Sequence, residues 1–255
     1  FRSETMTQNI FDNDTFFKEY MDLRFHKKNL NDLIEQPQMK RLLPEIKNKT
    51  ILDIGCGFGH NCLSFTKAGA RHVTGIDISV KMLEIAHKSF SHPVIDYLLM
   101  NMDELHTLQE TYDLVYSSLA FHYAEDFTAL IHNIYELLNP GGILLFSQEH
   151  PLMTASQGKG GHYNHDENGN CISYTFSDYG REGKRSGFWY VDHVENYHRT
   201  MGSIVTTLAH AGFMIEDMVE ALPDQKTLNE YPKLNKEFIK PTFLILRAKK
   251  VISEV

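Results

Sequence analysis

The chain has 255 residues, of which 42% are apolar and 23% are charged, and its formal net charge is −8. This length and composition favour one large soluble domain with a full core over two independent domains. The acidic balance argues against non-specific binding to nucleic acid or to an anionic membrane surface. An odd number of cysteines without CxxC spacing predicts no disulfide framework and favours a reducing compartment such as the cytoplasm.

The first half of the chain alternates between helical and strand patterns. An amphipathic helical pattern covers residues 11–48, with breaks expected at Pro37 and Pro44. Short apolar runs then predict strands at 50–57, 72–79, 94–100, 112–121 and 143–150. Helical patterns separate them at 61–69, 80–90 and 127–142. This alternation predicts parallel βαβ units with right-handed crossovers.

The alternation stops after residue 150. Residues 151–197 are rich in Gly, Tyr, His and Asn and show no clear period, which predicts a folded insertion over the active site rather than a plain connection. A helix at 201–213 and strands at 214–221 and 242–250 follow. The predicted organisation is one domain with a helical cover (1–48), a ligand-binding core (49–150), a cap insertion (151–197) and a C-terminal helix with two strands (198–255).

A glycine-rich turn closes the first predicted strand, in the run Asp53-Ile54-Gly55-Cys56-Gly57-Phe58-Gly59. Glycines lack the Cβ atoms that would block a ligand lying across a strand end. The spacing is GxGxG, which differs from the GxGxxG of nicotinamide-dependent enzymes, and no Gly-Lys-Ser/Thr follows as a P-loop requires. Asp77 closes the second strand, where a carboxylate can accept both hydroxyls of a ribose. An acidic turn favours a cationic ligand over a phosphate.

Together the runs ILDIGCGFG, GIDIS, YDLVYSSLAFHY and LNPGGILLFS resemble the class I S-adenosylmethionine-dependent methyltransferases. The segments FFKEYMDLR, SSLAFHY, SQEHP and NYHRT are similar to a bacterial subgroup that acts on small molecules. The resemblance implies a doubly wound α/β fold, with a seven-stranded Rossmann-like sheet whose last strand is antiparallel. It also implies S-adenosyl-L-methionine as the cofactor and a small-molecule acceptor, with no nucleic acid or membrane as partner.

The resemblance further implies which residues surround the cofactor. The glycine turn would line its methionine part, Asp77 would hold the ribose, and Ile78 would pack on the adenine. The loop after the third strand would meet the adenine edge, and two serines at the end of the fourth strand would approach the methionyl group. On an N-terminal helix, Arg24 would bind the methionyl carboxylate and Tyr20 would close the site, the alternative being a solvated helix face. The full predicted set is Tyr20, Arg24, Asp53, Gly55, Cys56, Gly57, Gly59, Asp77, Ile78, Met82, Met102, Asp103, Ser117 and Ser118.

Three histidines near predicted strand ends are candidate bases, because an oxygen nucleophile usually needs one. His122 follows the fourth strand, and the alternative for it is packing against the cofactor. His150 ends the fifth strand, where Pro151 fixes an extended exit. His198 precedes a helix that it could equally cap. Arg199 has two interpretations, a substrate carboxylate partner or an ion pair with a glutamate (Glu149 or Glu195).

Aromatic residues of the insertion, at Tyr163, Tyr174, Trp189 and Tyr190, predict either a lid over the acceptor or the insertion's own small core. No HxxxH or HExxH motif occurs, so a catalytic metal is not expected. The leading hypothesis is methyl transfer to a small molecule by in-line displacement. A catalytically silent cofactor-binding regulatory module and a protein methyltransferase are the alternatives.

Overall fold

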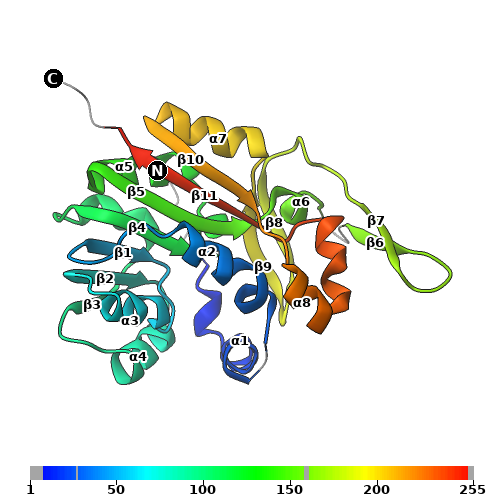
Figure 1. Ribbon diagram of the computed structural model, residues 1–255, viewed down its shortest axis with the longest axis horizontal. Helices are drawn as coiled ribbons and strands as arrows, with labels where there is room; N and C mark the ends of the chain where they lie inside the picture. The colour runs from blue at the N-terminus through cyan, green and yellow to red at the C-terminus, as the bar shows by residue number, and fades with distance from the viewer. Residues whose placement is uncertain (1–7, 27, 158–160, 252–255) are drawn as a thin grey trace, which may run out of the picture.

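A seven-stranded mixed sheet forms the centre of the computed structural model, which describes residues 8–26, 28–157 and 161–251. The strand order is β10-β11-β5-β4-β1-β2-β3 (Figure 1). The strands are β1 (Thr50–Ile54), β2 (His72–Asp77), β3 (Ile95–Leu99), β4 (Tyr112–Ser118), β5 (Leu138–Glu149), β10 (Phe213–Glu220) and β11 (Phe243–Lys250). β11 is antiparallel to both neighbours, whereas the other pairs in this sheet are parallel. The predicted fold class is confirmed.

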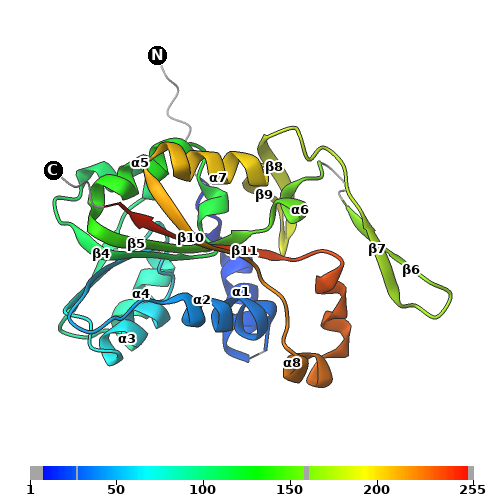
Figure 2. The same ribbon diagram turned by 45° about the horizontal axis from the view of Figure 1, so that its top comes forward.

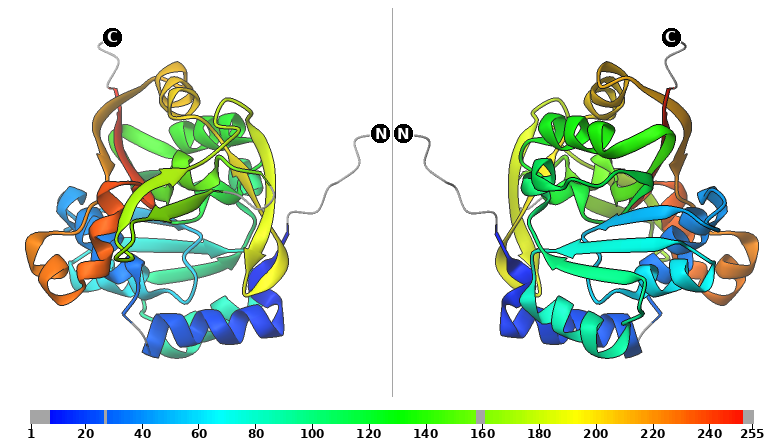
Figure 3. Two further views of the ribbon diagram at one scale, coloured as in Figure 1. Left: turned by 90° about the vertical axis from the view of Figure 1, so that its right-hand side faces the viewer. Right: turned by 90° about the vertical axis from the view of Figure 1, so that its left-hand side faces the viewer.

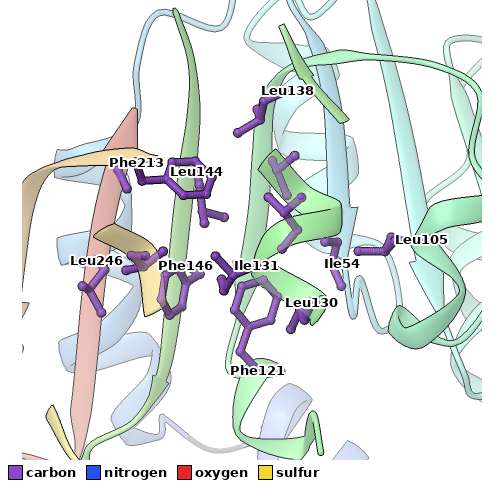
Figure 4. Packing of buried hydrophobic residues seen from close by; sticks show 14 of the residues in the cluster. Ile54, Leu105, Phe121, Leu130, Ile131, Leu138, Leu144, Phe146, Phe213 and Leu246 are labelled. Atoms are coloured by element: carbon purple, nitrogen blue, oxygen red, sulfur yellow. The ribbon is translucent and has the colours of Figure 1, made fainter. Parts of the chain in front are cut away.

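Helices cover both faces of the sheet (Figure 2). One face carries α5 (Phe127–Leu137), α7 (Met201–His210) and the 3₁₀ helix η3 (Met102–Thr107). The other face carries η2 (Asn31–Glu35), α2 (Gln36–Leu42), α3 (His60–Lys67) and α4 (Val80–Ser89). Successive strand residues point to opposite faces, so Leu52 belongs to the first core and Ile51 to the second. Figure 4 shows Phe121, Ile131 and Phe146 meeting in the first core.

The N-terminal cover consists of the 3₁₀ helix η1 (Ile10–Asp12) and α1 (Asp14–His26), followed by η2 and α2. The expected break at Pro37 is wrong, because helical structure runs through it from residue 30 to 42. η2 is a π-helix in which the Gln36 N–H donates to Asn31 O. Pro37 follows directly, in the first turn of α2, where its missing N–H costs little. The expected break before Pro44 is confirmed, since α2 ends at Leu42 and Leu43 is extended.

The insertion folds into α6 (Pro151–Thr154) and two antiparallel hairpins that the sequence did not predict. The first pairs β6 (His162–His165) with β7 (Cys171–Thr175) and projects from the body beside α8 (Gln225–Glu230) and the 3₁₀ helix η5 (Pro232–Phe238) (Figure 1). The second pairs β8 (Gly183–Trp189) with β9 (Val191–His198) and descends towards η1 and α1 (Figure 3). Another 3₁₀ helix, η4 (Phe121–Tyr123), follows β4. Within the described ranges, no helix is long and apolar enough to cross a membrane.

Candidate active site

A cavity of about 400 Å³ lies at the carboxyl ends of β1, β2 and β4. Its volume falls in the range of about 300–1000 Å³ that is usual for small-molecule sites. Open α/β sheets bind ligands at this edge, where the strand order reverses on either side of β1. The cover helix α1 and the hairpin β8–β9 complete the wall.

The glycine turn after β1 forms the floor of the cavity. Gly55 and Gly57 line it, and both adopt positive φ angles, +71° and +54°. A Cβ on Gly55 would lie 2.6 Å from Ala120 Cβ, so the turn and the end of β4 require glycine there. A Cβ on Gly57 would have no protein atom within 4 Å. A side chain at that position would therefore project into the cavity.

Asp77 lines the cavity at the end of β2 and holds the glycine turn in place. Its Oδ2 accepts the Gly57 N–H and its Oδ1 accepts the Ser79 N–H, each at 2.8 Å. Burial raises the pKa of Asp77 to about 6, although these hydrogen bonds oppose the rise. Each carboxylate oxygen retains a lone pair that a ribose hydroxyl could use.

An apolar wall stands beside Asp77. It contains Ile78, Met82 and Met102 as predicted, together with Met100 from the end of β3. Asp103 differs from the prediction, because it is exposed on η3 and lies outside the cavity lining. The wall suits a flat apolar group such as an adenine.

Tyr20 and Arg24 reach the cavity from α1, so the two residues predicted four apart on one helix face both line it. The Arg24 guanidinium lies over the Phe58 ring at 5.8 Å, and Nη1 lies 3.8 Å from Asp32. Within the part of the chain that the structure describes, Arg24 Nε is buried without a hydrogen-bond partner. A buried donor of this kind is costly unless a ligand atom accepts from it.

Glu35 was not predicted, yet it connects the cover to the sheet. This fully buried carboxylate accepts hydrogen bonds from Ser147 Oγ at 2.5 Å and Ser118 Oγ at 2.8 Å. Gln36 Nε2 donates to its second oxygen at 2.8 Å. With the Asn31 amide oriented so that both of its polar atoms are paired, its nitrogen donates to Glu35 Oε2 at 2.8 Å and its oxygen accepts from Arg24 Nη1 at 2.6 Å. The π-helix therefore links Arg24 to the ends of β4 and β5, through Ser118 and Ser147.

Three residues predicted to contact the cofactor lie beneath the cavity floor instead of lining it. Asp53 is buried and accepts from Cys62 Sγ at 3.3 Å, and burial raises its pKa to about 7. Ser117 Oγ donates to Ile54 O at 2.8 Å, which joins β4 to β1. A Cβ on Gly59 would lie 2.2 Å from the Tyr97 hydroxyl oxygen, so this glycine allows close packing.

Two other predicted residues, Cys56 and Ser118, do line the cavity. Burial raises the pKa of the Cys56 thiol to about 11, so the thiol stays protonated near neutral pH. Leu119 follows Ser118 with φ at +57°, a rare conformation for a leucine that is common at functional sites. Its N–H is held by Ser147, through the carbonyl at 3.1 Å and the hydroxyl at 3.0 Å.

Of the three candidate bases, the structure brings only His122 to the cavity. Its Nδ1 accepts the Glu149 N–H at 3.4 Å. In a neutral ring this arrangement puts the proton on Nε2. Burial lowers the pKa of His122, so the ring is neutral near pH 7 and presents a donor.

His150 and His198 are committed elsewhere. His150 Nε2 lies 2.9 Å from Glu220 Oε1, and its Nδ1 accepts the Leu152 N–H at the start of α6. His198 Nδ1 lies 2.8 Å from Thr154 Oγ1, and its Nε2 lies 2.8 Å from Tyr179 O. Both rings are outside the cavity lining. They hold the insertion against the sheet, and the structure does not support a role for either as a base.

Arg199 matches neither of its two interpretations. Its guanidinium donates to the carbonyl oxygens of Ala124 and Glu125. It also lies over the Phe127 ring at 5.0 Å. Within the described part of the chain, no ion pair joins it to Glu149 or Glu195. It therefore fixes the turn after η4, away from the cavity.

The aromatic residues of the insertion divide between two places. Trp189 and Tyr190 pack against Phe16 of α1, with ring centroids 5.1 and 6.0 Å away, and Trp189 lines the cavity. Tyr163 and Tyr174 pack on each other in the β6–β7 hairpin and lie outside the cavity lining. The lid is therefore built by β8–β9 together with the N-terminal cover.

Asp12, also not predicted, ties this cover to the start of α4. Its Oδ1 accepts from Ser79 Oγ at 2.6 Å and from the Lys81 N–H at 3.2 Å, at the start of α4. Burial alone would raise the pKa of Asp12, but these hydrogen bonds lower it. No sequence signal marks this contact, because 67 residues separate Asp12 from Ser79.

Comparison with known proteins finds a matching family, two similar proteins and a similar crystal structure. The family described as a methyltransferase domain matches residues 51–142. An uncharacterized protein of Haemophilus influenzae is 37% identical over 253 residues, which cover 95% of this chain and 97% of that protein. The crystal structure of an S-adenosylmethionine dependent methyltransferase from Mesorhizobium loti has a TM-score of 0.78 and 35% identity, and the match covers 84% of this chain and 97% of that one. A ubiquinone biosynthesis O-methyltransferase of Hydrogenovibrio crunogenus is 38% identical over 105 residues, but only 40% of this chain and 43% of that protein are covered.

Proposed function

The chain belongs to the S-adenosylmethionine-dependent methyltransferases, and we propose that it methylates a small-molecule acceptor by in-line displacement. The observation that carries this proposal is the lid. Rings from η1, α1, η4 and β8–β9 pack on one another across the edge of the cavity. A macromolecular substrate needs an open approach, whereas a small acceptor fits within a covered cavity.

Two observations support S-adenosylmethionine as a ligand of the residues that line the cavity. A side chain at Gly57 would project into the open space of the cavity, which indicates that the turn is kept clear for a ligand. The buried Arg24 Nε lacks a partner among the described residues, and a carboxylate would supply one. In the proposed arrangement Arg24 holds the methionyl carboxylate, Asp77 holds the ribose hydroxyls, and the apolar wall at Met82 and Met102 holds the adenine.

S-Adenosylmethionine supplies a methyl group that its sulfonium already activates, so the chain's own residues mainly orient and exclude water. Asp77 and Arg24 fix the two ends of the cofactor. The lid residues Tyr20 and Trp189 keep water from the reacting atoms. His122 presents its Nε2 proton to the acceptor end of the cavity and so orients the acceptor by a hydrogen bond.

A transfer assay with methyl-labelled S-adenosylmethionine tests this function. The protein is incubated with labelled cofactor and a filtered small-molecule extract, and then with an unfiltered extract that contains protein. We expect label in the small-molecule fraction, its loss in Asp77→Ala, and its retention in Asp96→Ala, which alters an exposed aspartate of β3. Label only in protein would favour the protein methyltransferase. Cofactor binding without transfer would favour a catalytically silent regulatory module.

A further inference from the structure

The cavity continues beyond the strands that would hold the cofactor. Apart from Arg24 of α1, the residues proposed to hold the cofactor lie in the segments that follow β1, β2 and β3 or at the end of β2, on one side of β4. On the other side of β4 lie β5 and β11, where Glu149 pairs with Phe243. Both residues line the cavity. If the proposed function holds, this side is where the acceptor binds.

Glu149 brings a negative charge to the acceptor side of the cavity. Its Oε2 accepts from Asn196 Nδ2 at 2.8 Å. Among the described residues, no lysine, arginine or histidine forms an ion pair with it. The nearby Lys240 ammonium is directed to Met153 Sδ and to the rings of Tyr163 and Tyr174. A half-buried carboxylate that forms no ion pair is unfavourable, and a cationic ligand in contact with it would relieve this cost.

Aromatic side chains line the same cavity. Tyr123 is next to His122 in η4, and burial together with the Glu149 carboxylate raises its pKa, so the phenol stays neutral. The Phe11 ring lies 6.1 Å from Tyr123 and 5.3 Å from Tyr20, and the Trp189 ring lies 6.0 Å from Tyr20. All four rings line the cavity. Aromatic faces attract cations, most strongly those of tryptophan and tyrosine.

The geometry points to a small amine as the methyl acceptor, with its nitrogen held by Glu149 and by the aromatic wall of Phe11, Tyr20, Tyr123 and Trp189. A hydroxyl acceptor requires a base in the transition state, and His122 presents a proton at Nε2. An anionic acceptor would be repelled by Glu149. An amine attacks without a base once it is neutral, and the positive charge that develops on its nitrogen is stabilised by a carboxylate and by aromatic rings.

The proton balance of the step is simple. The ammonium releases one proton to solvent before it reacts, which leaves a neutral amine with a free electron pair. This pair forms the new N–C bond while the C–S bond breaks and its electrons remain on sulfur. The product nitrogen carries the positive charge, which the Glu149 carboxylate stabilises.

Calorimetry with three matched probes tests the inference. The protein is first saturated with S-adenosylhomocysteine and then titrated with phenethylamine, phenethyl alcohol or phenylacetate, which share a scaffold and differ in the polar group. We expect the amine to bind at least about tenfold more tightly than the other two. Glu149→Gln keeps the shape and the bond to Asn196, and it should abolish this preference while S-adenosylhomocysteine affinity stays within about twofold. Glu84→Gln, at an exposed position of α4, is the control and should keep the preference.

The outcomes separate this inference from the proposed function. Absence of S-adenosylhomocysteine binding would contradict the proposed function itself. Normal binding of S-adenosylhomocysteine, with no binding of the amine or with equal affinity for the three probes, would overturn the amine assignment alone. A preference for the amine that survives Glu149→Gln would also overturn it, because the carboxylate would then not be the recognition element.

Discussion

Replacing Asp53 by asparagine should change how the stability of the protein depends on pH. Asp53 lies buried beneath the glycine turn, and burial raises its pKa from 3.8 to about 7. The donor to its carboxylate is the weak thiol of Cys62, at 3.3 Å. The nearby carboxylate of Asp77 raises the pKa further. The ionised form is therefore poorly stabilised in the folded protein.

The sign follows from comparing the two states. Between about pH 4 and about pH 7 the folded protein keeps the Asp53 proton, whereas the unfolded chain has lost it, so the free energy of unfolding falls as the pH rises through this window. A rise from 3.8 to about 7 corresponds to about 4 kcal/mol at ~1.4 kcal/mol per pH unit. About 3 kcal/mol of this loss falls between pH 5 and pH 8. An asparagine side chain cannot ionise, so the free energy of unfolding of Asp53→Asn should not show this loss.

Urea unfolding of the wild type and Asp53→Asn at pH 5 and pH 8 measures the effect. Titrating groups that do not interact with Asp53 are common to both proteins and cancel in the difference, whereas Asp77 is coupled to Asp53 and contributes to it. We expect the free energy of unfolding of the variant, relative to wild type, to rise by about 3 kcal/mol from pH 5 to pH 8. Asp113→Asn is the matched control, because hydrogen bonds lower the pKa of that carboxyl and it titrates below this window. An equal pH dependence in wild type and Asp53→Asn would refute the reasoning.

Three further predictions concern the supports of the cavity. Glu35→Ala should lower the free energy of unfolding by about 3–5 kcal/mol, because it leaves buried hydrogen-bond donors without an acceptor. Glu35→Gln should lower it by less, and urea unfolding of the two variants measures the difference. Gly59→Ala should lower the free energy of unfolding by about 1–3 kcal/mol, because the new Cβ would clash with Tyr97. Gly57→Ala should lower it by about 1 kcal/mol and should abolish cofactor binding. Equal losses of cofactor binding in the two variants would contradict this prediction. Trp189→Ala should increase hydrogen exchange in α1 and β8–β9 but not in the sheet, and unchanged exchange in α1 would show that the lid does not depend on this ring.

The central strands β1, β2 and β4 could be predicted because they are buried on both faces and read as apolar runs. The hairpins of the insertion could not. β6 has no buried residue and β8 has one, so neither hydrophobic alternation nor an apolar run marks these strands. The π-helix Asn31–Glu35 was also not predicted. Its wider turn lets the helix continue through Pro37, and the amino-acid composition gives no signal for such a turn.

The cofactor side of the site was more predictable than the catalytic side. Gly57 and Asp77 follow strand ends, and the position of a strand end fixes where such residues lie. For His150 and His198 the strand pattern indicates the position in the chain but not the direction of the ring. Each ring has one partner that is 44 or more residues away in the sequence. Glu35 looks like part of a solvated helix face in the sequence. Only the tertiary packing of η2 against the sheet buries it.

Calorimetric titration with S-adenosylmethionine tests the central claim most directly. The account predicts one binding site per chain, an affinity at least about tenfold weaker in Asp77→Ala, and no change in the control Asp96→Ala. NAD should not bind, because the turn has GxGxG spacing. No binding of S-adenosylmethionine at millimolar concentration, or equal binding by the wild type and Asp77→Ala, would contradict the assignment of this cavity.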